Sequence, residues 1–364
     1  MLRSSCWSIL FGAFANLNSA AAGLKLWSYL SMSVPGSIGN LQSPAADAGL
    51  ILAVDLGGTY LRAATIDAGG RLMNRLKLRT PDTDDPQEFV RVLACALRKC
   101  QGETDQIRAL SIVVPGPVDA KTGKVVKAPN LPCLNGFALA GALMSELQLP
   151  VMIENDANAA ALGELWQGAG RGCRTIICLT LGTGVGGGII LEGKLWRGAD
   201  QAAAEIGHMS VEPFGAVTCG CGSRGCLEVY ASATAIVRMA REAKPRYPSS
   251  GLSAVDDFTA EDVYRLAKQG DELAVEVFQR VGAYLGIGLA NLINILNPEM
   301  IVIGGGVANA WDLFQGEVWQ QVNERAFPLP AAKVKIVPAE CNDDAGLLGA
   351  AQLGFWQSEV LLSA

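Results

Sequence analysis

The only histidine of this 364-residue chain lies next to its densest group of cysteines. His208 is followed by Cys219, Cys221 and Cys226 within the stretch GHMSVEPFGAVTCGCGSRGCLE, residues 207–228. Three thiolates and one imidazole match a closed tetrahedral zinc site, which leaves no position for a reactive water. Unrelated cysteines would not explain where the sole histidine lies. The sequence therefore predicts a structural zinc ion bound by these four residues.

A zinc site of this kind limits the chemistry that the rest of the chain can do. With its one histidine engaged, Ser-His-Asp and Cys-His mechanisms are excluded, and acid–base chemistry falls to a carboxylate, a lysine or a tyrosine. A zinc-finger module that binds nucleic acid is the other functional interpretation. No basic helix follows the cluster, however, and the net charge is −6 with a pI of about 5.1. The composition therefore predicts no nucleic-acid partner.

Two glycine-rich turns have the residue types of phosphate loops. DLGGT (55–59) and LGTG (181–184) each follow an apolar run and precede another. Glycine lets backbone N–H groups approach phosphate oxygens, threonine adds a hydroxyl donor, and an aspartate can hold Mg²⁺ through water. The pair of turns predicts two phosphate loops, formed by Asp55, Gly57, Gly58 and Thr59 and by Gly182, Thr183 and Gly184.

The second turn also satisfies the dinucleotide-binding pattern G-x-G-x-x-G over residues 182–187. That pattern needs a helix directly after the loop, whose N-terminus receives the pyrophosphate. Here the loop continues into VGGGIIL, which is typical of a strand. No G-x-x-x-x-G-K-[ST] pattern occurs either. A dehydrogenase and an ordinary P-loop protein are therefore disfavoured.

The hydrophobic pattern predicts an α/β chain built from two similar halves. The strand–turn–strand pattern of residues 50–72 returns at 174–195, which indicates a repeated design. Strands mixed with helices in each half imply a cleft between the halves. Further strands are predicted from residue 107, at 149–154 and at 299–303, and helices at 86–100, directly after residue 154, at 231–244, 259–269, 271–297 and from the caps Asp343 and Asp344 to about 357.

The N-terminal stretch differs in composition from the rest. Its first 46 residues contain no Asp or Glu, and its apolar run, residues 7–15, is far shorter than the ~20 residues of a membrane span. A secretory signal, an organelle transit peptide, a disordered leader and an upstream start with translation from Met32 stay open as interpretations. Scattered single cysteines elsewhere indicate a reduced compartment, so we expect a cytoplasmic protein without a membrane partner.

Taken together, these motifs resemble those of the ROK sugar kinases, a family with the actin-like, hexokinase-like ATPase fold. The resemblance runs from about residue 50 to 355. It rests on DLGGT (55–59), VPGPVD (114–119), APNL (128–131), ENDANAAALGE (154–164), LGTGVGGG (181–188), EIGH (205–208), CGCGSRGCLE (219–228) and GGG (304–306). The chain departs from the family in GADQAAAEIGH (198–208), where members usually have glycines before EIGH.

The resemblance implies a two-domain α/β fold of the actin-like (ribonuclease H-like) ATPase type, with an interdomain cleft and a structural zinc loop. Residues 1–49 would be a leader, 50–165 a small N-terminal domain and 166–345 a larger domain with the zinc loop. Residues 346–364 would form a C-terminal helix that packs back on the small domain.

The resemblance also implies roles for individual residues. Asp156 is similar to the catalytic base of the family. The ligands of the sugar hydroxyls would be Asn130, Asn155, Asp156, Glu205, His208 and Glu228. Gly304, Gly305 and Gly306 would lie by the nucleoside. His208 would serve twice, with one ring nitrogen on zinc and the other towards the sugar. Taken singly, Asn155 or Asp156 could cap the alanine-rich helix, whose dipole would favour an ionised Asp156.

The implied activity is ATP-dependent phosphorylation of a hexose with Mg²⁺, with glucose as the expected acceptor and glucose 6-phosphate as the product. Kinases for fructose, mannose, N-acetylmannosamine or N-acetylglucosamine are the alternatives within the family. A sugar-responsive ROK repressor is the alternative from another class, and it needs an N-terminal DNA-binding domain. The resemblance further implies a homodimer in the cytoplasm, with organelle targeting left open.

Overall fold

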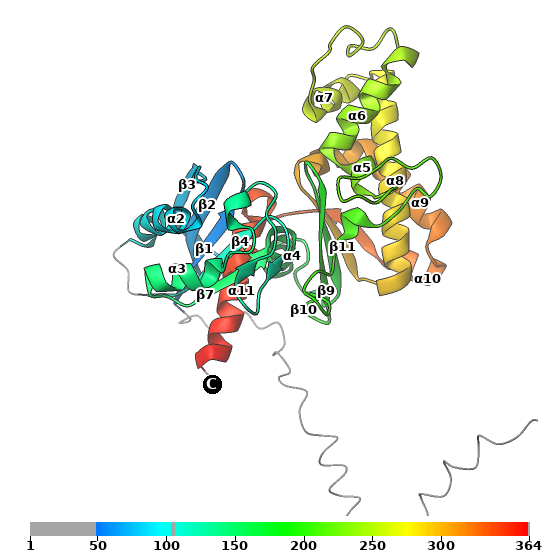
Figure 1. Cartoon of the computed structure of the whole chain (residues 1–364). Helices are drawn as coiled ribbons and strands as arrows, with labels where there is room; N and C mark the ends of the chain where they lie inside the picture. Colours follow the sequence, from blue (N-terminus) through cyan, green and yellow to red (C-terminus); the bar gives the residue numbers. More distant parts are fainter. Residues whose placement is uncertain (1–48, 103–105, 363–364) are drawn as a thin grey trace, which may run out of the picture. The chain divides into compact units, whose positions relative to one another are not determined.

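A computed structural model of the chain describes residues 49–102 and 106–362, with side chains described as far as Trp356. The chain divides into Met1–Gln42 and Ser43–Ala364, and every described element belongs to the second unit. The leader predicted over residues 1–49 therefore lies almost wholly outside the described residues. The elements of the second unit are shown in Figure 1.

The first sheet has the strand order β3-β2-β1-β4-β7. β2 pairs antiparallel with both β1 and β3, whereas β1, β4 and β7 run parallel. β1 is an almost continuous apolar run, as expected of a strand that is covered on both faces. The bounds are Leu50–Leu56 for β1, Tyr60–Asp67 for β2, Leu72–Arg79 for β3, Ile107–Val114 for β4 and Val151–Asn155 for β7.

The second sheet repeats this design strand for strand, in the order β10-β9-β8-β11-β12. β9 pairs antiparallel with β8 and β10, whereas β8, β11 and β12 run parallel. The repeated hairpin pattern therefore predicted two sheets of one topology. The bounds are Ile176–Leu181 for β8, Val185–Leu191 for β9, Lys194–Leu195 for β10, Met300–Gly304 for β11 and Lys335–Pro338 for β12. A separate two-stranded ribbon pairs β5 (Val118–Asp119) with β6 (Lys124–Val125).

Helices join and cover the sheets (Figure 1). With the first sheet lie α2 (Pro86–Gln101), α3 (Leu139–Leu147) and α11 (Ala345–Leu362), and α4 (Asp156–Gln167) packs between α11 and strands β8 and β9 of the second sheet. With the second lie α5 (Glu228–Ala231), α6 (Ala233–Ala243), α7 (Ala260–Lys268), α8 (Glu272–Leu296), α9 (Trp311–Arg325) and α10 (Pro328–Ala331). Short 3₁₀ turns are η1 (Pro132–Leu134), η2 (Ile206–His208), η3 (Lys244–Arg246), η4 (Gly306–Ala310) and η5 (Asn342–Asp344).

One apolar cluster connects the two sheets. It includes Ile51 of β1, Ile176 and Cys178 of β8, and residues of α4 and α11 such as Leu162 and Leu347, all nearly or fully buried. α11 thus packs against β1 and α4, while each half keeps a larger apolar core of its own. The domain boundaries at residues 165 and 345 stay a prediction.

The glycines of β9 let two other segments approach it closely. A Cβ atom on Gly188 would lie 2.6 Å from the Cβ of Ala161 in α4, and one on Gly187 would lie 2.6 Å from the carbonyl oxygen of Ala204. Successive residues of a strand face opposite sides, so β9 lies between α4 and the segment that leads into η2. The glycines of β9 are thus explained by close packing. Because residues 182–184 are followed by this strand and not by a helix, the dinucleotide-binding interpretation is excluded.

Two details differ from the sequence prediction. Asp343 and Asp344 lie in η5 instead of capping a helix with their side chains, and the Asp344 carboxylate accepts hydrogen bonds from both terminal nitrogens of Arg75, at 2.9 and 2.8 Å. By length and composition, α8 is the one helix in the described ranges that could cross a membrane, yet 61% of its most apolar window is buried within the protein.

Candidate active site

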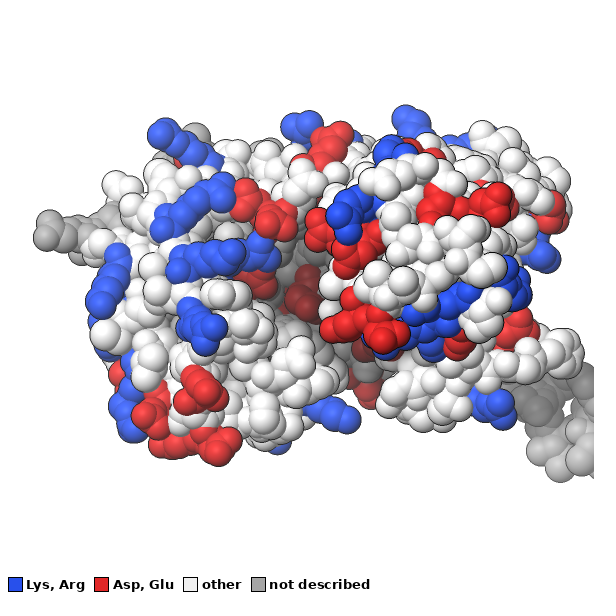
Figure 2. Space-filling view, turned by 90° about the horizontal axis from the view of Figure 1, so that it is seen from above, with Lys and Arg blue, Asp and Glu red and all other residues white. Residues whose placement is uncertain are grey.

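A cavity of about 420 Å³ brings together residues from both sheets. Figure 2 shows that the surface is hollowed and that acidic side chains lie on the walls of the hollow. Asp55 comes from the end of β1, Asp156 from the first position of α4, and Gly304–Gly306 from the end of β11. Its other polar lining residues are Arg62, Glu164, Thr180, Asn309, Asn342 and Asp343.

Asp156 is held at the N-terminus of α4 by its neighbours. Its Oδ1 accepts hydrogen bonds from the backbone N–H of Ala157, at 2.8 Å, and from the Asn155 side chain, at 3.0 Å. Its surface is open to the cavity, but protein surrounds it closely enough that lost hydration raises its pKa to about 6, and the charge of Asp55 adds to this rise. The N–H of Ala157 favours the ionised carboxylate, as expected at a helix N-terminus, but desolvation outweighs this effect.

Asn155 is the N-cap of α4. Its Oδ1 accepts from the N–H groups of Ala157, at 3.0 Å, and Asn158, at 3.1 Å, while its Nδ2 donates to the carbonyl of Gly116 and to Asp156. The capping interpretation thus holds for this residue, and the amide also orients the Asp156 carboxylate. A sugar hydroxyl would have to share an amide that is already fully engaged.

Asn130 packs against the first glycine-rich turn, and the residue before it packs against Gly116. A Cβ atom on Gly116 would lie 3.5 Å from Cδ of Pro129, and one on Gly58 would lie 2.5 Å from the Cβ of Asn130. Gly116 is also the residue whose carbonyl accepts from Asn155. The structure therefore brings Asn130, Asn155 and the turn at Gly58 into one neighbourhood, although Asn130 does not line the 420 Å³ cavity.

Asp55 has a basic partner that sequence reasoning missed. The Arg62 guanidinium donates to its Oδ2 at 2.7 Å, and another nitrogen of Arg62 lies 3.6 Å from Asp343. Burial raises the pKa of Asp55 above its ordinary value, although Arg62 opposes the rise. A cation on Asp55 would therefore share the carboxylate with Arg62. The only sequence signal was a basic residue on the strand that follows DLGGT.

The two glycine-rich turns use some of their own amides and leave others available. Gly57 donates to the carbonyl of Tyr60, at 3.0 Å, and Gly182 to that of Gly184, at 2.9 Å. Within the described residues, the N–H groups of the turn positions that remain have no hydrogen-bond partner: Gly58, Thr59, Thr183 and Gly184. Gly57 and Gly182 thus shape the turns, and the four other amides can donate to an anion.

Glu228 connects the second turn with the cysteine cluster. It is the first residue of α5, and its Oε2 accepts from the N–H of Val185 at 3.1 Å. A Cβ atom on Gly184 would lie 2.4 Å from the same oxygen, so any larger residue there would displace the Glu228 carboxylate. The other oxygen, Oε1, accepts from the Cys219 thiol at 3.5 Å.

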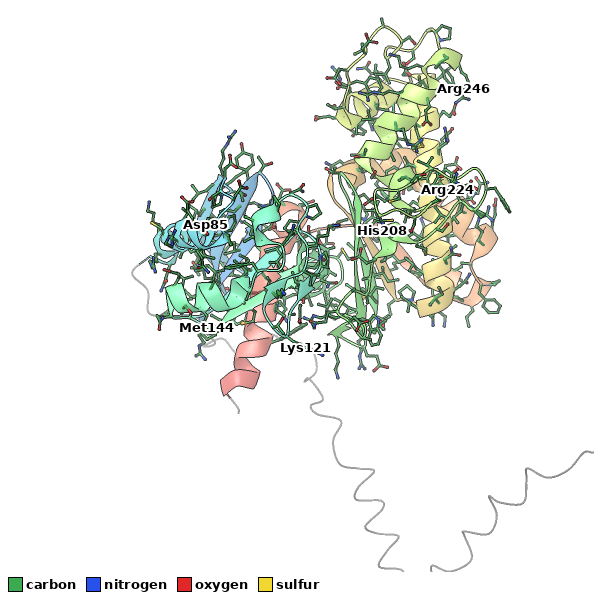
Figure 3. All side chains as sticks on the ribbon, in the orientation of Figure 1. Asp85, Lys121, Met144, His208, Arg224 and Arg246 are labelled. Atoms are coloured by element: carbon green, nitrogen blue, oxygen red, sulfur yellow. The ribbon has the colours of Figure 1, made fainter. Side chains whose placement is uncertain are left out.

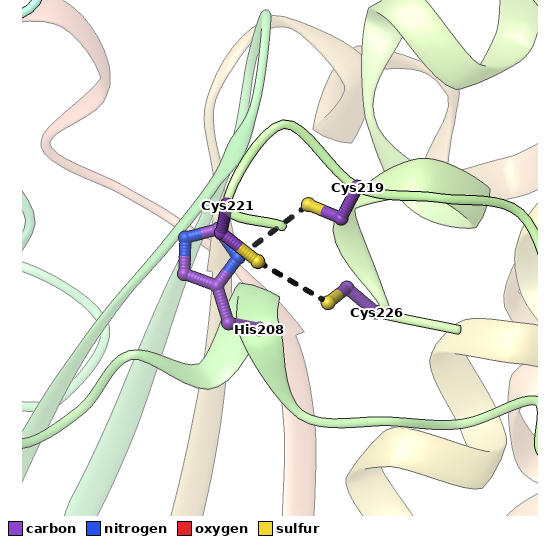
Figure 4. A group of neighbouring side chains, drawn as sticks. All are labelled: His208, Cys219, Cys221 and Cys226. Carbon is purple, nitrogen blue, oxygen red and sulfur yellow. Dashed lines mark hydrogen bonds between the residues drawn. The ribbon is translucent and has the colours of Figure 1, made fainter. Parts of the chain in front are cut away.

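His208, Cys219, Cys221 and Cys226 converge on one point, as Figure 4 shows. Their ligand atoms all lie within 4.8 Å of one another. Nδ1 of His208 lies 3.7 Å from the Cys219 sulfur, and the sulfurs of Cys221 and Cys226 are also 3.7 Å apart. Tetrahedral zinc with bonds of about 2.3 Å to sulfur needs sulfurs roughly 3.8 Å apart, so the spacing fits this ion.

The second ring nitrogen of His208 points away from the thiols towards an acid. Nε2 lies 3.9 Å from Oε2 of Glu205, and both side chains are partly open to solvent. This is the arrangement in which one nitrogen binds a metal while the other stays available to a neighbour. Glu205 and His208 do not line the 420 Å³ cavity.

A second cavity, of about 450 Å³, adjoins the first at Gly306 and Asn309. It begins at Gly182 and Thr183 of the second turn, and aromatic and aliphatic side chains line it: Ile236, Tyr264, Phe278, Val307 and Ala310. Gly305 has φ of 82°, and a Cβ atom there would lie 2.4 Å from the carbonyl oxygen of Leu181, so the turn needs glycine. The lining residues from α6 to α8 were not singled out from the sequence because helical spacing is typical of any core helix.

Glu164 is another residue whose part sequence reasoning missed. Its side chain is buried, and its two carboxylate oxygens accept from the N–H groups of Ala169, Glu340 and Cys341, at 2.8 to 3.1 Å. It thereby ties the end of α4 to the segment that precedes α11. Its place at the end of ENDANAAALGE was the only signal in the sequence.

Comparisons with known proteins agree with this arrangement. The sequence profile of the ROK family matches residues 51–355. The chain is 38% identical over 305 residues to a glucokinase of Halalkalibacterium halodurans, an alignment that covers 81% of this chain and 92% of that protein. It is also 33% identical over 312 residues to a xylose repressor of Caldicellulosiruptor bescii, covering 83% of this chain and 77% of that protein.

A solved structure supports the same assignment. The ROK family glucokinase of Streptomyces griseus, in complex with glucose and AMPPNP, superposes with a TM-score of 0.70 at 36% identity. The superposition covers 84% of this chain and 99% of that one. The chain therefore belongs to the ROK family and has its actin-like ATPase fold.

Proposed function

We propose that this protein is a glucokinase, which transfers the γ-phosphoryl group of ATP to glucose and releases glucose 6-phosphate and ADP. The observation that carries the proposal is the cavity in which Asp156, Asp55 and Gly304–Gly306 meet. The relatives supply the substrate class, since the glucokinases of H. halodurans and S. griseus align over nearly their whole length.

Asp156 is the general base of the proposed reaction. The sugar hydroxyl loses its proton as its oxygen attacks the γ-phosphorus, and the Asp156 carboxylate accepts that proton. A pKa of about 6 leaves most of this carboxylate ionised at neutral pH while making it a better proton acceptor than an ordinary aspartate. The Asn155 amide and the Ala157 N–H fix its orientation, which matters because phosphoryl transfer depends chiefly on positioning.

The nucleotide extends across both cavities in this proposal. The apolar cavity lined by Tyr264 and Phe278 takes the base, and Gly306, which both cavities share, lies beneath the nucleoside. The free amides of Gly58, Thr59, Thr183 and Gly184 hold the phosphates. Asp55 would hold the Mg²⁺ that accompanies ATP, and such an ion would neutralise charge on the phosphates.

The sugar is bound beside Asp156 by the residues that the family resemblance implies. Asn130 lies against the first phosphate loop and Glu228 against the second. Glu205 directly precedes η2 and lies next to His208, the last residue of that turn. His208, Cys219, Cys221 and Cys226 would hold a structural zinc ion, and this coordination would fix the orientation of the His208 imidazole. Glu228 follows the last cysteine of the cluster by two residues and accepts from the N–H of Val185, so the same loop also positions the second phosphate turn.

A coupled assay with a panel of hexoses tests the proposal. We expect ATP-dependent phosphorylation with the highest kcat/KM for glucose. A higher value for fructose, mannose or an N-acetylhexosamine would keep the kinase and change its substrate. No turnover with any hexose, together with sugar-dependent binding to DNA, would identify a repressor. This alternative is included because the chain is also similar to a xylose repressor.

The cellular setting of the proposed enzyme follows from its thiols. Nine cysteines lie in the described residues, and all nine are unpaired, which suits the reducing cytoplasm. A homodimer and the domain limits at 165 and 345 stay predictions, which sedimentation and limited proteolysis measure.

A further inference from the structure

The segment of residues 196–204 joins β10 to Glu205 and η2, and its backbone is unusual. Gln201 has φ of 60° and Ala204 has φ of 66°, in the left-handed region that residues with a Cβ rarely adopt. A side chain that persists in such a conformation needs compensating contacts.

Gln201 makes these contacts with a turn of the other half of the fold. Its Oε1 accepts from the backbone N–H of Ala120, at 3.0 Å, and its Nε2 donates to Oδ1 of Asp119, at 2.7 Å. Asp119 ends β5, and Figure 3 places the neighbouring Lys121 beside the lower end of the second sheet. We call this pair of hydrogen bonds the Gln201 clasp.

The Asp119 carboxylate is itself fixed in place. Its oxygens accept from the N–H groups of Lys121 and Thr122, at 3.0 and 3.3 Å, and from the Thr122 hydroxyl, at 2.7 Å. These bonds, led by that of the Thr122 hydroxyl and followed by that of Gln201, hold the pKa of Asp119 below its ordinary value. The acceptor of the clasp is therefore a charged, preoriented group, which makes a stronger hydrogen bond than a neutral one.

The other end of the segment is tied to the strand that leads to Asp156. Arg197 donates to the buried carboxylate of Glu154 in β7, at 2.7 Å, and that carboxylate also accepts from the N–H of Asn155. The segment is thus anchored at Arg197 and at Gln201, and Glu205 follows directly. The position of Glu205 relative to Asp156 therefore depends on both Arg197 and Gln201.

We propose that Gln201 is a positioning residue for the sugar site, because its clasp on Asp119 and Ala120 holds the segment of residues 196–204 so that Glu205 and His208 face the sugar. This inference rests on the proposed function. Gln201 itself does not touch the reacting atoms.

The variant Gln201→Gly tests the proposal. Glycine adopts φ of 60° without strain, so the substitution removes the clasp and leaves the backbone path accessible. We expect the KM for glucose to rise roughly 10- to 100-fold, the scale of losing a hydrogen bond to a charged group, with the KM for ATP changed by less than about 2-fold. Asp119→Ala removes the same contact from the other side, and the double variant should be no worse than the more affected single variant.

A matched control is available in Gln148→Gly. Gln148 also has a left-handed backbone, with φ of 56°, and its amide donates to Ser145 within its own helix end. This variant should keep the wild-type KM for both substrates. If Gln201 had a purely structural role, the Gln201→Gly protein would have a changed melting temperature and an unchanged KM for glucose. That outcome would overturn the proposal.

Hydrogen exchange separates failure of the clasp from failure of the proposed function. In the full chain without substrates, amides of residues 197–205 should exchange faster in Gln201→Gly than in wild type. If they do while wild type phosphorylates no hexose, the clasp stands and the kinase proposal fails. If exchange is unchanged, the clasp does not hold the segment and the inference is wrong.

Discussion

Asp156 combines two properties that a helix-capping residue would not need: it faces a cavity, and its pKa is raised to about 6. Asn155, not Asp156, is the N-cap, so replacing Asp156 by asparagine should leave α4 intact. We expect Asp156→Asn to bind glucose and to lose about 10²–10⁴-fold in kcat, the usual scale for a positioned general base. Steady-state kinetics measure this, with Asp85→Asn, at the exposed N-cap of α2, as the control.

Asp156→Asn, which should lower kcat, should raise the stability of the folded protein above neutral pH. The folded protein raises the pKa of the Asp156 carboxyl, so folding favours the protonated form of this group. The stability that the protonated carboxyl contributes is therefore fully present below its ordinary pKa of about 4 and is lost as pH rises through about 6. Asp156→Asn should therefore melt at a higher temperature than wild type at about pH 8, and the difference should vanish near pH 4. A destabilised Asp156→Asn protein at high pH would contradict this.

The pH dependence of catalysis follows from the ionised form of Asp156. A base must be deprotonated to accept a proton, so kcat/KM for glucose should fall as pH is lowered through about 6 and level off above it. A profile measured with the coupled assay decides this point. An inflection near 4 would mean that Asp156 is not desolvated in the free enzyme.

At the scale of elements, the Cys/His loop joins three functional parts. Within about twenty residues it contains His208, the last residue of η2, Cys219, whose sulfur lies 3.5 Å from Oε1 of Glu228, and Glu228 itself at the start of α5. Loss of the bound metal should therefore disturb the sugar side and the second phosphate turn together, because Glu228 accepts from Val185 directly after that turn.

We accordingly expect about one zinc per chain, as a closed four-ligand site predicts, and expect Cys221→Ser to lower metal content, melting temperature and glucose affinity together. Elemental analysis, thermal unfolding and kinetics provide the three measurements. Cys95→Ser is the control, since Cys95 is an exposed cysteine on α2 outside the cluster. Active enzyme without zinc would rule out the structural ion.

At the scale of the whole molecule, every element that forms the sheets and cavities lies after residue 49. A chain that starts at Met32 keeps all of them. We expect it to melt within a few degrees of the full chain, since roughly 1 kcal/mol shifts the melting temperature of a large domain by only about 2–4 °C, and to keep kcat and KM. Loss of activity in a folded protein that starts at Met32 would make the leader part of the catalytic unit.

Local features of the sequence determined much of the fold. The hairpins at 50–67 and 176–191, the parallel strands after them and the long helix α8 follow from apolar runs and turn residues. The longer elements that the sequence pattern missed are β3, α3 and α9, and the short strands β5, β6, β10 and β12 and the short helix α10 were missed as well. β3 is a largely exposed edge strand and β12 has four residues, so neither carries a strong periodic signal.

The candidate site divides in the same way. The convergence of His208, Cys219, Cys221 and Cys226 and the two glycine-rich turns were predictable, because their residues lie close together in the chain and their types limit the chemistry. Only the tertiary structure decided that Arg62 pairs with Asp55, that burial raises the pKa of Asp156, and that Gln201 reaches Asp119. These contacts depend on how distant segments pack, and spacing along one chain carries no information about desolvation or about which charges meet across a fold.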